Sequence, residues 1–561
     1  MNKKWECTNV NEKKVKELMQ NYKINEILAK ILVNKGLENK DEIELFINPT
    51  RNDFHDPFLM PDMKIAVDRL LKAKDNNEKI IIYGDYDADG ITSVTVLKTF
   101  LEERGMQVTS YIPNRLDEGY GLNKKAIEKI YEDGYRLMIT VDCGISGIDE
   151  IDYANSLGME VIVTDHHEPA EVLPNAIAVV DAKRKDNKYP FNQLAGVGVV
   201  FKLIQAISRT LNLEEKDYLK YLDIVCIGTI SDIVPLVDEN RVIAKLGLKL
   251  VAQTKNIGLR ALLEVTGYRN IDSTTISFGV APRINACGRM GNEKIALDLF
   301  LSKDYDEAKK LAMQLNDFNL KRQEIEKRIF EEAVLKVENE ENDKVCIIIG
   351  SEGWHHGIIG IVASKITEMY FKPSILICFE DDEGKGSGRS IPGFDLHDAL
   401  MKCGKHLEKY GGHAMAVGVT VKKDEFQNVK KVIEEYAKEC NVDKIIPIIN
   451  ADCELTLKEI NINNVKSLDV LEPYGEANKK PLFLFKNLKI NSIRALSEGK
   501  HLKLSLKDDK YIIDAIGFNI GDLASKYLID DKVDVIGSLD INSFNGNESV
   551  QIIIKDIRKS Y

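Results

Sequence analysis

The most regular feature of the chain is a set of three short apolar runs that each end in acidic or histidine residues. They lie at 80–83, 137–141 and 161–164, and they run into GDYDADG, DCG and DHH, respectively. Consecutive apolar positions are typical of strands buried on both faces of a parallel sheet. Helical patterns alternate with apolar runs up to about residue 235, as in βαβ units. Ligands of such sheets bind at the carboxyl ends of the strands, so we expect the acids and histidines to share one crevice.

Further along the chain the pattern changes twice. Apolar residues at spacings of three and four predict one long helix, and a second set of apolar runs then surrounds a Gly-rich turn at 384–390. We therefore predict an α/β protein with two α/β domains joined by a long helix, followed by an all-β barrel. The expected segments are an N-terminal helical segment (1–54), a first α/β domain (55–303), the connecting helix (304–343), a second α/β domain (344–444) and the barrel (445–561).

The last segment shows the two-residue alternation of strands with one solvated face. In HLKLSLK the leucines share one face, while Lys503, Ser505 and Lys507 share the other. Strand-like runs follow near 511–518, 533–540 and 549–555, with a short helical stretch at 521–528. Five strands with one intervening helix suit an OB-type barrel. The lysine face fits a nucleic-acid backbone and a merely solvated strand about equally well.

The acids and histidines at the strand ends form a candidate metal cluster. Its members are Asp85, Asp87, Asp89, Asp142, His166 and Asp232. So many carboxylates in one crevice require cations between them, and carboxylates mixed with imidazole favour Mn²⁺ or Mg²⁺ over metals that prefer thiolates. Two such ions can hold the attacking and leaving oxygens of a phosphoryl displacement. A calcium-binding EF-hand is excluded, because the position that needs a glutamate is Val96.

Composition narrows the class of protein. A net charge of −12 excludes nucleic-acid binding through overall positive charge. The nine cysteines contain no CxxC pair, which argues against zinc ribbons and disulfide frameworks. We expect a cytoplasmic, reduced protein, since no run reaches the roughly 20 apolar residues of a membrane helix and the start lacks a secretory signal.

These motifs together resemble a known family. Gly84–Gly90, Val141–Gly144 and Asp165–His167 look like the motifs of the DHH phosphoesterase superfamily, and Gly411–His413 looks like the hallmark of its companion DHHA1 domain. Within that superfamily, RINACGR at 283–289 and GWHHGIIG at 353–360 resemble the RecJ branch of bacterial exonucleases. The resemblance implies that the two α/β domains are DHH and DHHA1. It also implies hydrolysis of single-stranded DNA from the 5′ end to 5′-mononucleotides, in recombination and repair.

The resemblance also implies a role for each acid and histidine. One ion would be held by Asp85, Asp87 and Asp142, and the other by Asp89, His166 and Asp232, with Asp142 bridging the two. His167 would orient the phosphate or the leaving oxygen, and Asp165 would orient His166. A water between the ions would be the nucleophile.

Candidate substrate-binding residues lie throughout the chain. Arg115 resembles the residue that faces the terminal phosphate, and an arginine can grip phosphate oxygens with two hydrogen bonds. For each of the other candidates an ordinary structural role is the alternative: a salt bridge for an arginine, a turn for the glycine-rich segment, the core for a tryptophan. These candidates are Arg283, Asn285, Arg289, Trp354, His355, Ser387, Arg389, Ser390, His413, Lys503 and Lys507.

Three functions compete at this point. The first is the two-metal exonuclease on single-stranded DNA, for which the resemblance suggests a single-strand-binding protein and a RecQ-type helicase as partners, with no membrane. The second is a relative that acts on small substrates such as dinucleotides or pyrophosphate, and the β-rich C-terminal segment argues against it. The third is a non-enzymatic replication scaffold, and the complete set of expected metal ligands argues against that.

Overall fold

The computed structural model describes residues 3–115, 118–341, 343–544 and 546–560, which divide into two compact units. One unit comprises Asp56–Asp232 and Leu250–Pro447. The other comprises Met1–His55, Ile233–Lys249 and Ile448–Tyr561. Residues 233–249 were expected in the DHH domain, yet they pack with the barrel. No described helix is long and apolar enough to cross a membrane.

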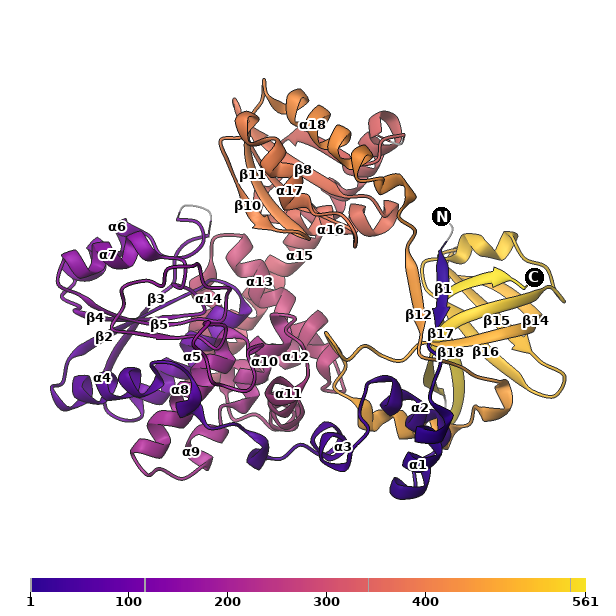
Figure 1. Ribbon diagram of the computed structural model, residues 1–561, viewed down its shortest axis with the longest axis horizontal. Helices are drawn as coiled ribbons and strands as arrows, with labels where there is room; N and C mark the ends of the chain where they lie inside the picture. Colours follow the sequence, from indigo (N-terminus) through magenta and orange to yellow (C-terminus); the bar gives the residue numbers. More distant parts are fainter. Residues whose placement is uncertain (1–2, 116–117, 342, 545, 561) are drawn as a thin grey trace. The chain divides into compact units, whose positions relative to one another are not determined.

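The first unit is built around a parallel sheet with the order β3-β2-β4-β5-β6 (Figure 1). Its strands are β2 (Lys79–Gly84), β3 (Gln107–Tyr111), β4 (Leu137–Val141), β5 (Glu160–Thr164) and β6 (Ala178–Val180). The three apolar runs of the sequence are the neighbours β2, β4 and β5, so their carboxyl ends lie side by side as predicted. Helices α6 and α7 cover one face of the sheet, where Ile127, Ile130 and Ile151 pack on it.

A helical layer completes the DHH part of this unit. Helices α5, α8 and α10 pack on one another, and the first two begin at the strand ends where the acids lie. The helices of this part are α4 (Met63–Asp75), α5 (Ala88–Glu102), α6 (Lys124–Glu132), α7 (Ile148–Ser156), α8 (Gly196–Thr210), α9 (Lys216–Leu219), α10 (Leu222–Ser231), α12 (Ile257–Thr266), α13 (Ala281–Arg289) and α14 (Glu293–Leu301). A one-turn π-helix, η3 (Thr275–Val280), precedes α13.

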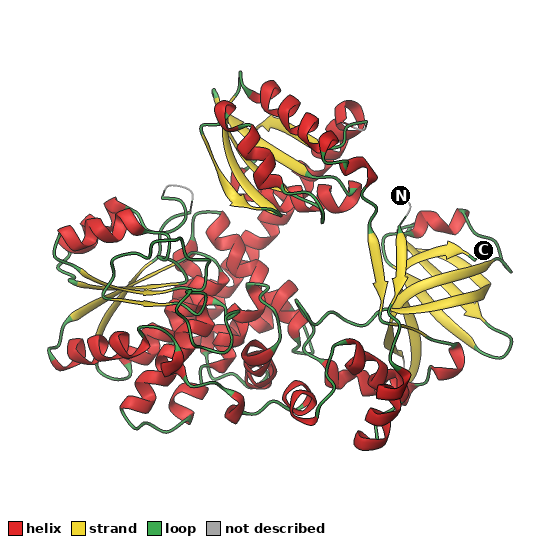
Figure 2. Ribbon diagram, in the orientation of Figure 1, coloured by secondary structure: helices red, strands yellow, loops and turns green. Residues whose placement is uncertain are grey.

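The predicted long helix is α15 (Tyr305–Lys336), which a π-helical turn, η4 (Val337–Glu341), extends. In the middle of this helix, the side chain of Asn319 is buried and accepts a hydrogen bond from Arg322. The helix leads into a five-stranded sheet with the order β10-β11-β9-β8-β7 (Figure 2). Its elements are β7 (Ile347–Glu352), α16 (His356–Tyr370), β8 (Ser374–Glu380), β9 (Glu383–Arg389), α17 (Leu396–Lys402), β10 (Lys409–His413), β11 (Ala416–Lys422) and α18 (Phe426–Glu439).

The Gly-rich segment predicted as a turn is strand β9, in the interior of that sheet. Its glycines are needed because neighbouring strands place large side chains over them. A Cβ atom on Gly384 would lie 2.7 Å from side-chain atoms of Ile377 and Phe379, and one on Gly388 would lie 2.7 Å from Val417. Glycine composition suggested a loop, whereas these glycines make room for cross-strand packing.

The second unit contains the predicted barrel. Strand β14 pairs with both β15 and β17, and β16 pairs with β18, so the five strands close on themselves. The strands are β14 (Phe483–Leu496), β15 (His501–Lys507), β16 (Ile512–Gly517), β17 (Lys532–Phe544) and β18 (Asn547–Lys559), and the expected helical stretch is the 3₁₀ turn η9 (Gly521–Ser525). The fold class predicted from the sequence is therefore confirmed.

The barrel shares its hydrophobic core with the helices near the N-terminus. Apolar residues of α1 (Glu12–Tyr22), α2 (Glu26–Asn34) and α3 (Lys40–Ile47) belong to the same buried cluster as the leucines of β15. Strand β1 (Lys4–Cys7) pairs in parallel with β12 (Ile448–Ala451), and the short β13 (Cys453–Glu454) and α19 (Ile462–Lys466) lead into β14. Most of α11 (Asp238–Val251) also belongs to this unit.

A buried arginine ties three of these segments together. Arg241 of α11 is 1% exposed, and its guanidinium lies over the Phe46 ring at 3.6 Å. It donates hydrogen bonds to the backbone carbonyl of Phe46 and to those of Leu471 and Glu472. Burial lowers its pKa to about 10. A charge buried in this way is stabilised by the carbonyl oxygens that surround it.

Candidate metal centre and substrate groove

Each metal-ligand candidate is positioned by the end of a strand or helix. Asp85 follows β2, Asp142 follows β4, His166 follows β5, and Asp232 ends α10. Asp87 is the N-cap of α5 and accepts hydrogen bonds from the backbone N–H groups of residues 89 and 90. Asp89 lies in the first turn of that helix. The loop spacing D-x-D-x-D thus places three carboxylates around one helix N-terminus, where the helix dipole favours negative charge.

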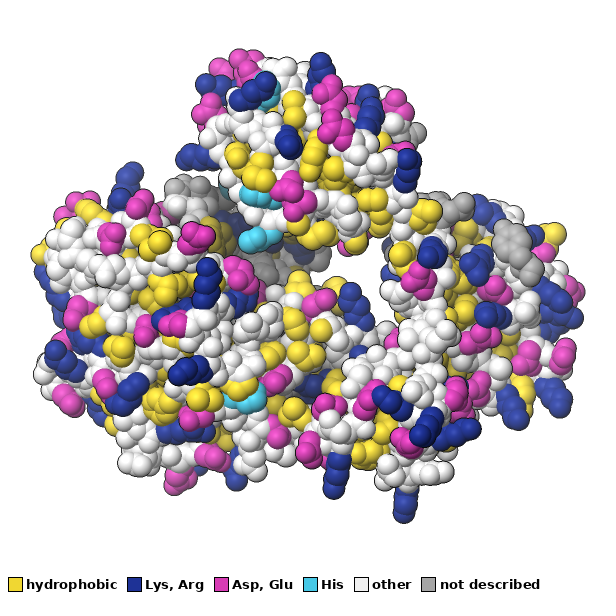
Figure 3. Space-filling view, in the orientation of Figure 1, with side chains coloured by type: hydrophobic (Ala, Val, Ile, Leu, Met, Phe, Trp, Pro, Cys, Tyr) yellow, Lys and Arg dark blue, Asp and Glu magenta, His cyan; other side chains and the backbone are white. Residues whose placement is uncertain are grey.

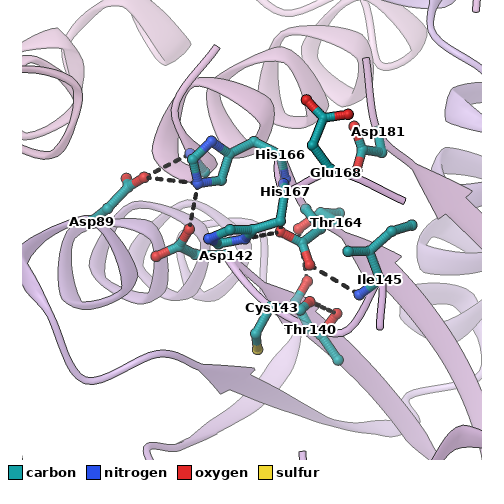
Figure 4. Close-up of polar contacts among 12 residues, drawn as sticks. Asp89, Thr140, Asp142, Cys143, Ile145, Thr164, His166, His167, Glu168 and Asp181 are labelled. Carbon is teal, nitrogen blue, oxygen red and sulfur yellow. Dashed lines mark hydrogen bonds and ion pairs between the residues drawn. The ribbon is translucent and has the colours of Figure 1, made fainter. Parts of the chain in front are cut away.

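Of these acids, Asp89, Asp142 and Asp232 surround His166, and Figure 4 shows the first two. The Nε2 atom of His166 lies 3.1 Å from an oxygen of Asp142, 3.6 Å from Asp232 and 3.9 Å from Asp89. Ligand atoms of Asp89, His166 and Asp232 lie within 4.8 Å of one another, and so do those of Asp85, Asp87 and Asp142. The two predicted ligand sets are thus present as two adjacent groups, with Asp142 in contact with both.

The electrostatics of the cluster fit two bound cations. Burial and the neighbouring acids raise the pKa of Asp85, Asp89 and Asp142 well above the ordinary range, and they raise that of Asp232 to about 7. Burial lowers the pKa of His166 to about 3, so its ring is neutral and can act as a ligand. Buried atoms of Asp85, Asp142 and His166 also lack hydrogen-bond partners. Divalent ions would satisfy these atoms and keep the acids ionised.

Backbone groups hold the cluster in place. The two oxygens of Asp89 accept hydrogen bonds from Gly196 N and Val197 N, at 2.7 and 2.8 Å, at the start of α8. Gly196 has to be glycine, since a Cβ atom there would lie 2.5 Å from an oxygen of Asp142. The contact of Asp89 with the start of α8 was not predicted, although the sequence GVG at the start of a helical pattern could have indicated it.

Asp165 orients His167 and does not orient the ring of His166, which corrects one expectation. Its Oδ1 atom accepts a hydrogen bond from His167 Nδ1 at 2.7 Å and from the backbone N–H of His166. Its Oδ2 atom accepts one from Ile145 N. Burial alone would lower the pKa of His167, but the bond to Asp165 outweighs it and raises that pKa to about 9. His167 is therefore a cation beside the acids, with the hydroxyl of Tyr120 3.3 Å from its Nε2.

Three arginines gather on the other side of the D-x-D-x-D loop. The Arg115 guanidinium lies 4.9 Å from the centre of the Tyr86 ring. Burial and the nearby charges of Arg115 and Arg322 lower the pKa of Arg289 to about 10. Arg289 also donates a hydrogen bond to Gly357 O at 2.8 Å. Clustered guanidinium groups repel one another, so this surface favours a bound anion such as phosphate.

A groove of about 610 Å³ lies beside these arginines, between residues of the DHH and DHHA1 parts. Cations and aromatic rings line it: Arg115, Tyr120, His356, Lys385, Lys409 and Tyr410. Gly411 and Gly418 are paired across β10 and β11, and the space above both is open. A nucleic-acid backbone can therefore approach the sheet closely, and the basic and aromatic lining suits single strands. Of these six residues only Arg115 was predicted from the sequence, because a single tyrosine, histidine or lysine outside a motif does not indicate a binding site.

The structure corrects several substrate-binding expectations. Trp354 is 4% exposed in the apolar core and donates to Glu332, so its ring cannot stack on a base. Asn285 holds the catalytic loop, because its Oδ1 atom accepts a hydrogen bond from Ala88 N at 2.8 Å. Ser390 is buried and donates to Phe394 O. His355 caps α16 through its Nδ1 atom, which leaves only its other nitrogen for a ligand.

The contacts of the remaining candidates leave their role in substrate binding a prediction. The Arg389 guanidinium donates to Ser387 Oγ at 3.1 Å, next to α16. His413 is exposed at the end of strand β10. Arg283 is half-buried on α13. In the barrel, Lys503 and Lys507 point outward, but each has an acidic neighbour: Asp514 at 3.0 Å and Asp530 at 3.7 Å, respectively.

Three parts of this architecture match models of known domain families. The model of the DHH family N-terminal domain matches residues 79–229, that of the DHHA1 domain matches 335–439, and that of the RecJ OB domain matches 451–556. The chain is 37% identical to the single-stranded-DNA-specific exonuclease RecJ of Bacillus subtilis, over 99% of this chain and 70% of the relative. It is 33% identical to that of Haemophilus influenzae, over 94% and 95%, respectively.

Solved structures agree with these matches. RecJ from Thermus thermophilus in complex with Mn²⁺ superposes with a TM-score of 0.86 and 29% identity, over 100% of this chain and 80% of that one. A structure of exonuclease RecJ bound to manganese matches with a TM-score of 0.61 and 33% identity, over 69% and 97%, respectively. The strand-end acids, the DHHA1 sheet, the barrel and these relatives lead to one conclusion: the chain belongs to the RecJ family of single-stranded-DNA-specific exonucleases.

Proposed function

We propose that this chain is a two-metal exonuclease that hydrolyses single-stranded DNA from its 5′ end and releases 5′-mononucleotides. The observation that carries the proposal is the juxtaposition of opposite charges around one loop. Several buried acids surround Asp142, and the protonated His167 offsets their charge only in part, while Arg115, Arg289 and Arg322 lie near Tyr86. An enzyme that cleaves a phosphodiester needs both: a site for cations at the reacting phosphorus and fixed positive charge for the neighbouring phosphates.

Each residue of the cluster has a distinct part in the proposed reaction. The two sets of metal ligands would hold a pair of Mn²⁺ or Mg²⁺ ions. These ions would supply a water of lowered pKa and stabilise the developing charge on the scissile phosphate. The protonated His167, fixed by Asp165, donates a hydrogen bond to a phosphate oxygen or to the leaving oxygen. Asn285 keeps the Asp87–Asp89 loop in place through Ala88 N.

The groove supports recognition of a terminal phosphate. Arg115 stands between the metal cluster and the groove, beside Tyr86 and among the groove-lining residues. A 5′-phosphate bound there would place the first phosphodiester near the metal ligands, so that one nucleotide is released at a time. Basic and acidic side chains are interspersed over the face shown in Figure 3, so the strand is attracted by this local cluster and not by the charge of the whole surface.

Digestion of end-labelled oligonucleotides tests the proposal. With Mn²⁺ or Mg²⁺, a 5′-labelled single strand should release labelled mononucleotide at once, whereas a 3′-labelled strand should shorten progressively. Arg115→Met should lower kcat/KM mainly on 5′-phosphorylated strands. Arg209→Met is the matched control, because Arg209 is an exposed arginine paired with Asp56. Mononucleotide release from the 3′ end would contradict the proposed direction, and an equal loss of kcat/KM with and without the 5′-phosphate would contradict the proposed role of Arg115.

Action on small substrates is the second candidate, and the same assay separates it. An enzyme for dinucleotides would cleave them at least as fast as long strands. Partnership with a single-strand-binding protein and a RecQ-type helicase, and a role in recombination and repair, stay predictions from the family. A pull-down of each partner with the full chain checks them.

A further inference from the structure

We infer that Tyr268 and Phe278 form a base-stacking platform for the DNA strand, outside the metal cluster and outside the groove. The inference rests on the proposed function, since it names a further contact with the same substrate. Tyr268 is 43% exposed and Phe278 is 70% exposed, whereas most large aromatic side chains of a folded protein are largely buried. Exposed rings are the elements on which successive bases of a single strand stack.

The local backbone brings the Tyr268 ring close to the helical turn that carries Phe278. Phe278 lies in the π-helical turn η3, a rare geometry that is frequent at functional sites. Gly279 follows it, and a Cβ atom at that position would lie 2.9 Å from the Tyr268 ring. The glycine therefore makes room for the ring of Tyr268 against η3, one residue from Phe278. A larger residue at position 279 would push Tyr268 away.

Fixed positive charge accompanies the rings. The Arg283 guanidinium donates to Gly279 O at 2.6 Å and to Asn316 Oδ1 at 3.1 Å, so it is held beside the platform. Arg269 is exposed next to Tyr268. The acids of this region have hydrogen-bond donors of their own. Asp272 accepts hydrogen bonds from Thr275, and Glu264 accepts one from Tyr305. Two rings with two guanidinium groups form a surface for bases and phosphates.

A single short helix connects the platform to the D-x-D-x-D loop at residues 85–89. Phe278 lies just before α13, and Asn285 on α13 holds Ala88 N beside the metal ligands. Seven residues separate Phe278 from Asn285, which corresponds to roughly 10 Å of helical rise. A strand that leaves the metal cluster along α13 would meet the platform within the first few nucleotides. The proposed occupant is therefore the part of the DNA strand that has not yet been cleaved.

Fluorescence of a base analogue reads the contact directly. Single strands carry 2-aminopurine at one of the first eight positions from the 5′ end, and binding to the full-length protein is followed in EDTA so that no cleavage occurs. Stacking should quench the fluorophore at one or two internal positions. Tyr268→Ala and Phe278→Ala should remove that quench, and Phe278→Trp should restore it. A quench pattern that is the same in wild type and in the double alanine variant would overturn the platform.

Kinetics on substrates of two lengths provide the second measurement. Base stacking contributes about 1–3 kcal/mol per base, so the double variant should raise KM on a 40-nucleotide strand roughly 5- to 100-fold. Its kcat, and its KM on a trinucleotide, should match the wild type. Leu335→Ala is the matched control, because Leu335 is 60% exposed on α15 and should leave KM unchanged. Thermal unfolding verifies that each variant is folded.

The outcomes separate this inference from the proposed function. If wild-type protein released nucleotides from the 3′ end, the direction would be wrong, while the quench pattern would still report the platform. If the double variant kept the wild-type KM on long strands, the platform would be overturned, and the exposed rings would be assigned to a protein partner. If KM rose equally on both substrates, the rings would act on the fold of the site, which would also overturn the platform.

Discussion

The metal cluster and the outer face of the barrel both carry charged side chains, but they balance these charges in opposite ways. Asp142 is 3% exposed among other acids, and one of its oxygens lacks a hydrogen-bond donor. Lys503 is exposed and forms an ion pair with Asp514 across two strands at 3.0 Å. Burial of like charges costs free energy that a bound ligand recovers, whereas an exposed pair is worth about 0–1 kcal/mol. A cluster of buried like charges is therefore a stronger indication of a binding site than an exposed ion pair.

Removal of one carboxylate from the cluster should have the largest effect. Asp142 contacts both groups of ligands, so Asp142→Ala should lower kcat/KM at least roughly 10³-fold, or about 4 kcal/mol of transition-state stabilisation. Steady-state digestion of a 5′-phosphorylated strand in saturating Mn²⁺ measures this. Unchanged activity would mean that the acids are not the metal site.

Thermal unfolding compares the two regions directly. In EDTA, Asp142→Asn should raise the unfolding midpoint, because it removes one of several repelling buried charges. In Mn²⁺ at about 100 times its Kd, the wild type should gain about 2.7 kcal/mol and the variant much less. Asp514→Asn, the counterpart on the barrel, should change the midpoint little under either condition. Equal behaviour of both variants would remove the distinction between the two regions.

Weakening the contact that orients His167 should have an intermediate effect on activity. Asp165→Asn keeps the shape of the side chain but weakens its bonds to His167, and residues that orient a reacting group typically contribute 10- to 100-fold. We expect a decrease of that size in kcat, with KM nearly unchanged. Asp223→Asn is the control, since Asp223 is also buried but accepts its hydrogen bond from Thr254 at the opposite end of α10 from Asp232. A decrease in KM alone would assign Asp165 a different role.

The barrel lysines should show the smallest effect. Lys503→Gln combined with Lys507→Gln should raise KM on long strands only a few-fold, because each lysine already has an acidic neighbour. If both contact phosphates, the slope of log affinity against log salt should fall by about 1.4, since single strands contribute about 0.7 per phosphate. A loss of affinity for long strands of 100-fold or more would show that these lysines bind DNA strongly despite their ion pairs.

The sequence predicted the features that depend on local pattern. The shared crevice at the ends of β2, β4 and β5, the long helix and the barrel follow from apolar periodicity and from acids at strand ends, whereas the division of the metal ligands into two groups was implied by the family resemblance. These features are encoded within a few residues of where they act.

Features that depend on distant partners could not be found in this way. Trp354 was an open choice between a base and the core until its packing partners were known. The glycines of β9 indicated a turn, because the side chains that cross them come from other strands. The partner of Asp165 is decided by side-chain rotamers, which a sequence does not show. The groove is assembled from residues almost 300 positions apart, so no local pattern marks it.

The discontinuous barrel unit has a consequence for how the protein is made. Its hydrophobic core combines α1, α2 and α3, which lie within residues 12–47, with β14–β18, which lie within residues 483–559. During synthesis the apolar faces of these helices therefore stay uncovered until β14–β18 have been translated. A truncation that removes residues 448–561 would leave the apolar faces of those helices uncovered and Arg241 without the carbonyl groups of Leu471 and Glu472, so a minimal nuclease made from this chain should begin after His55.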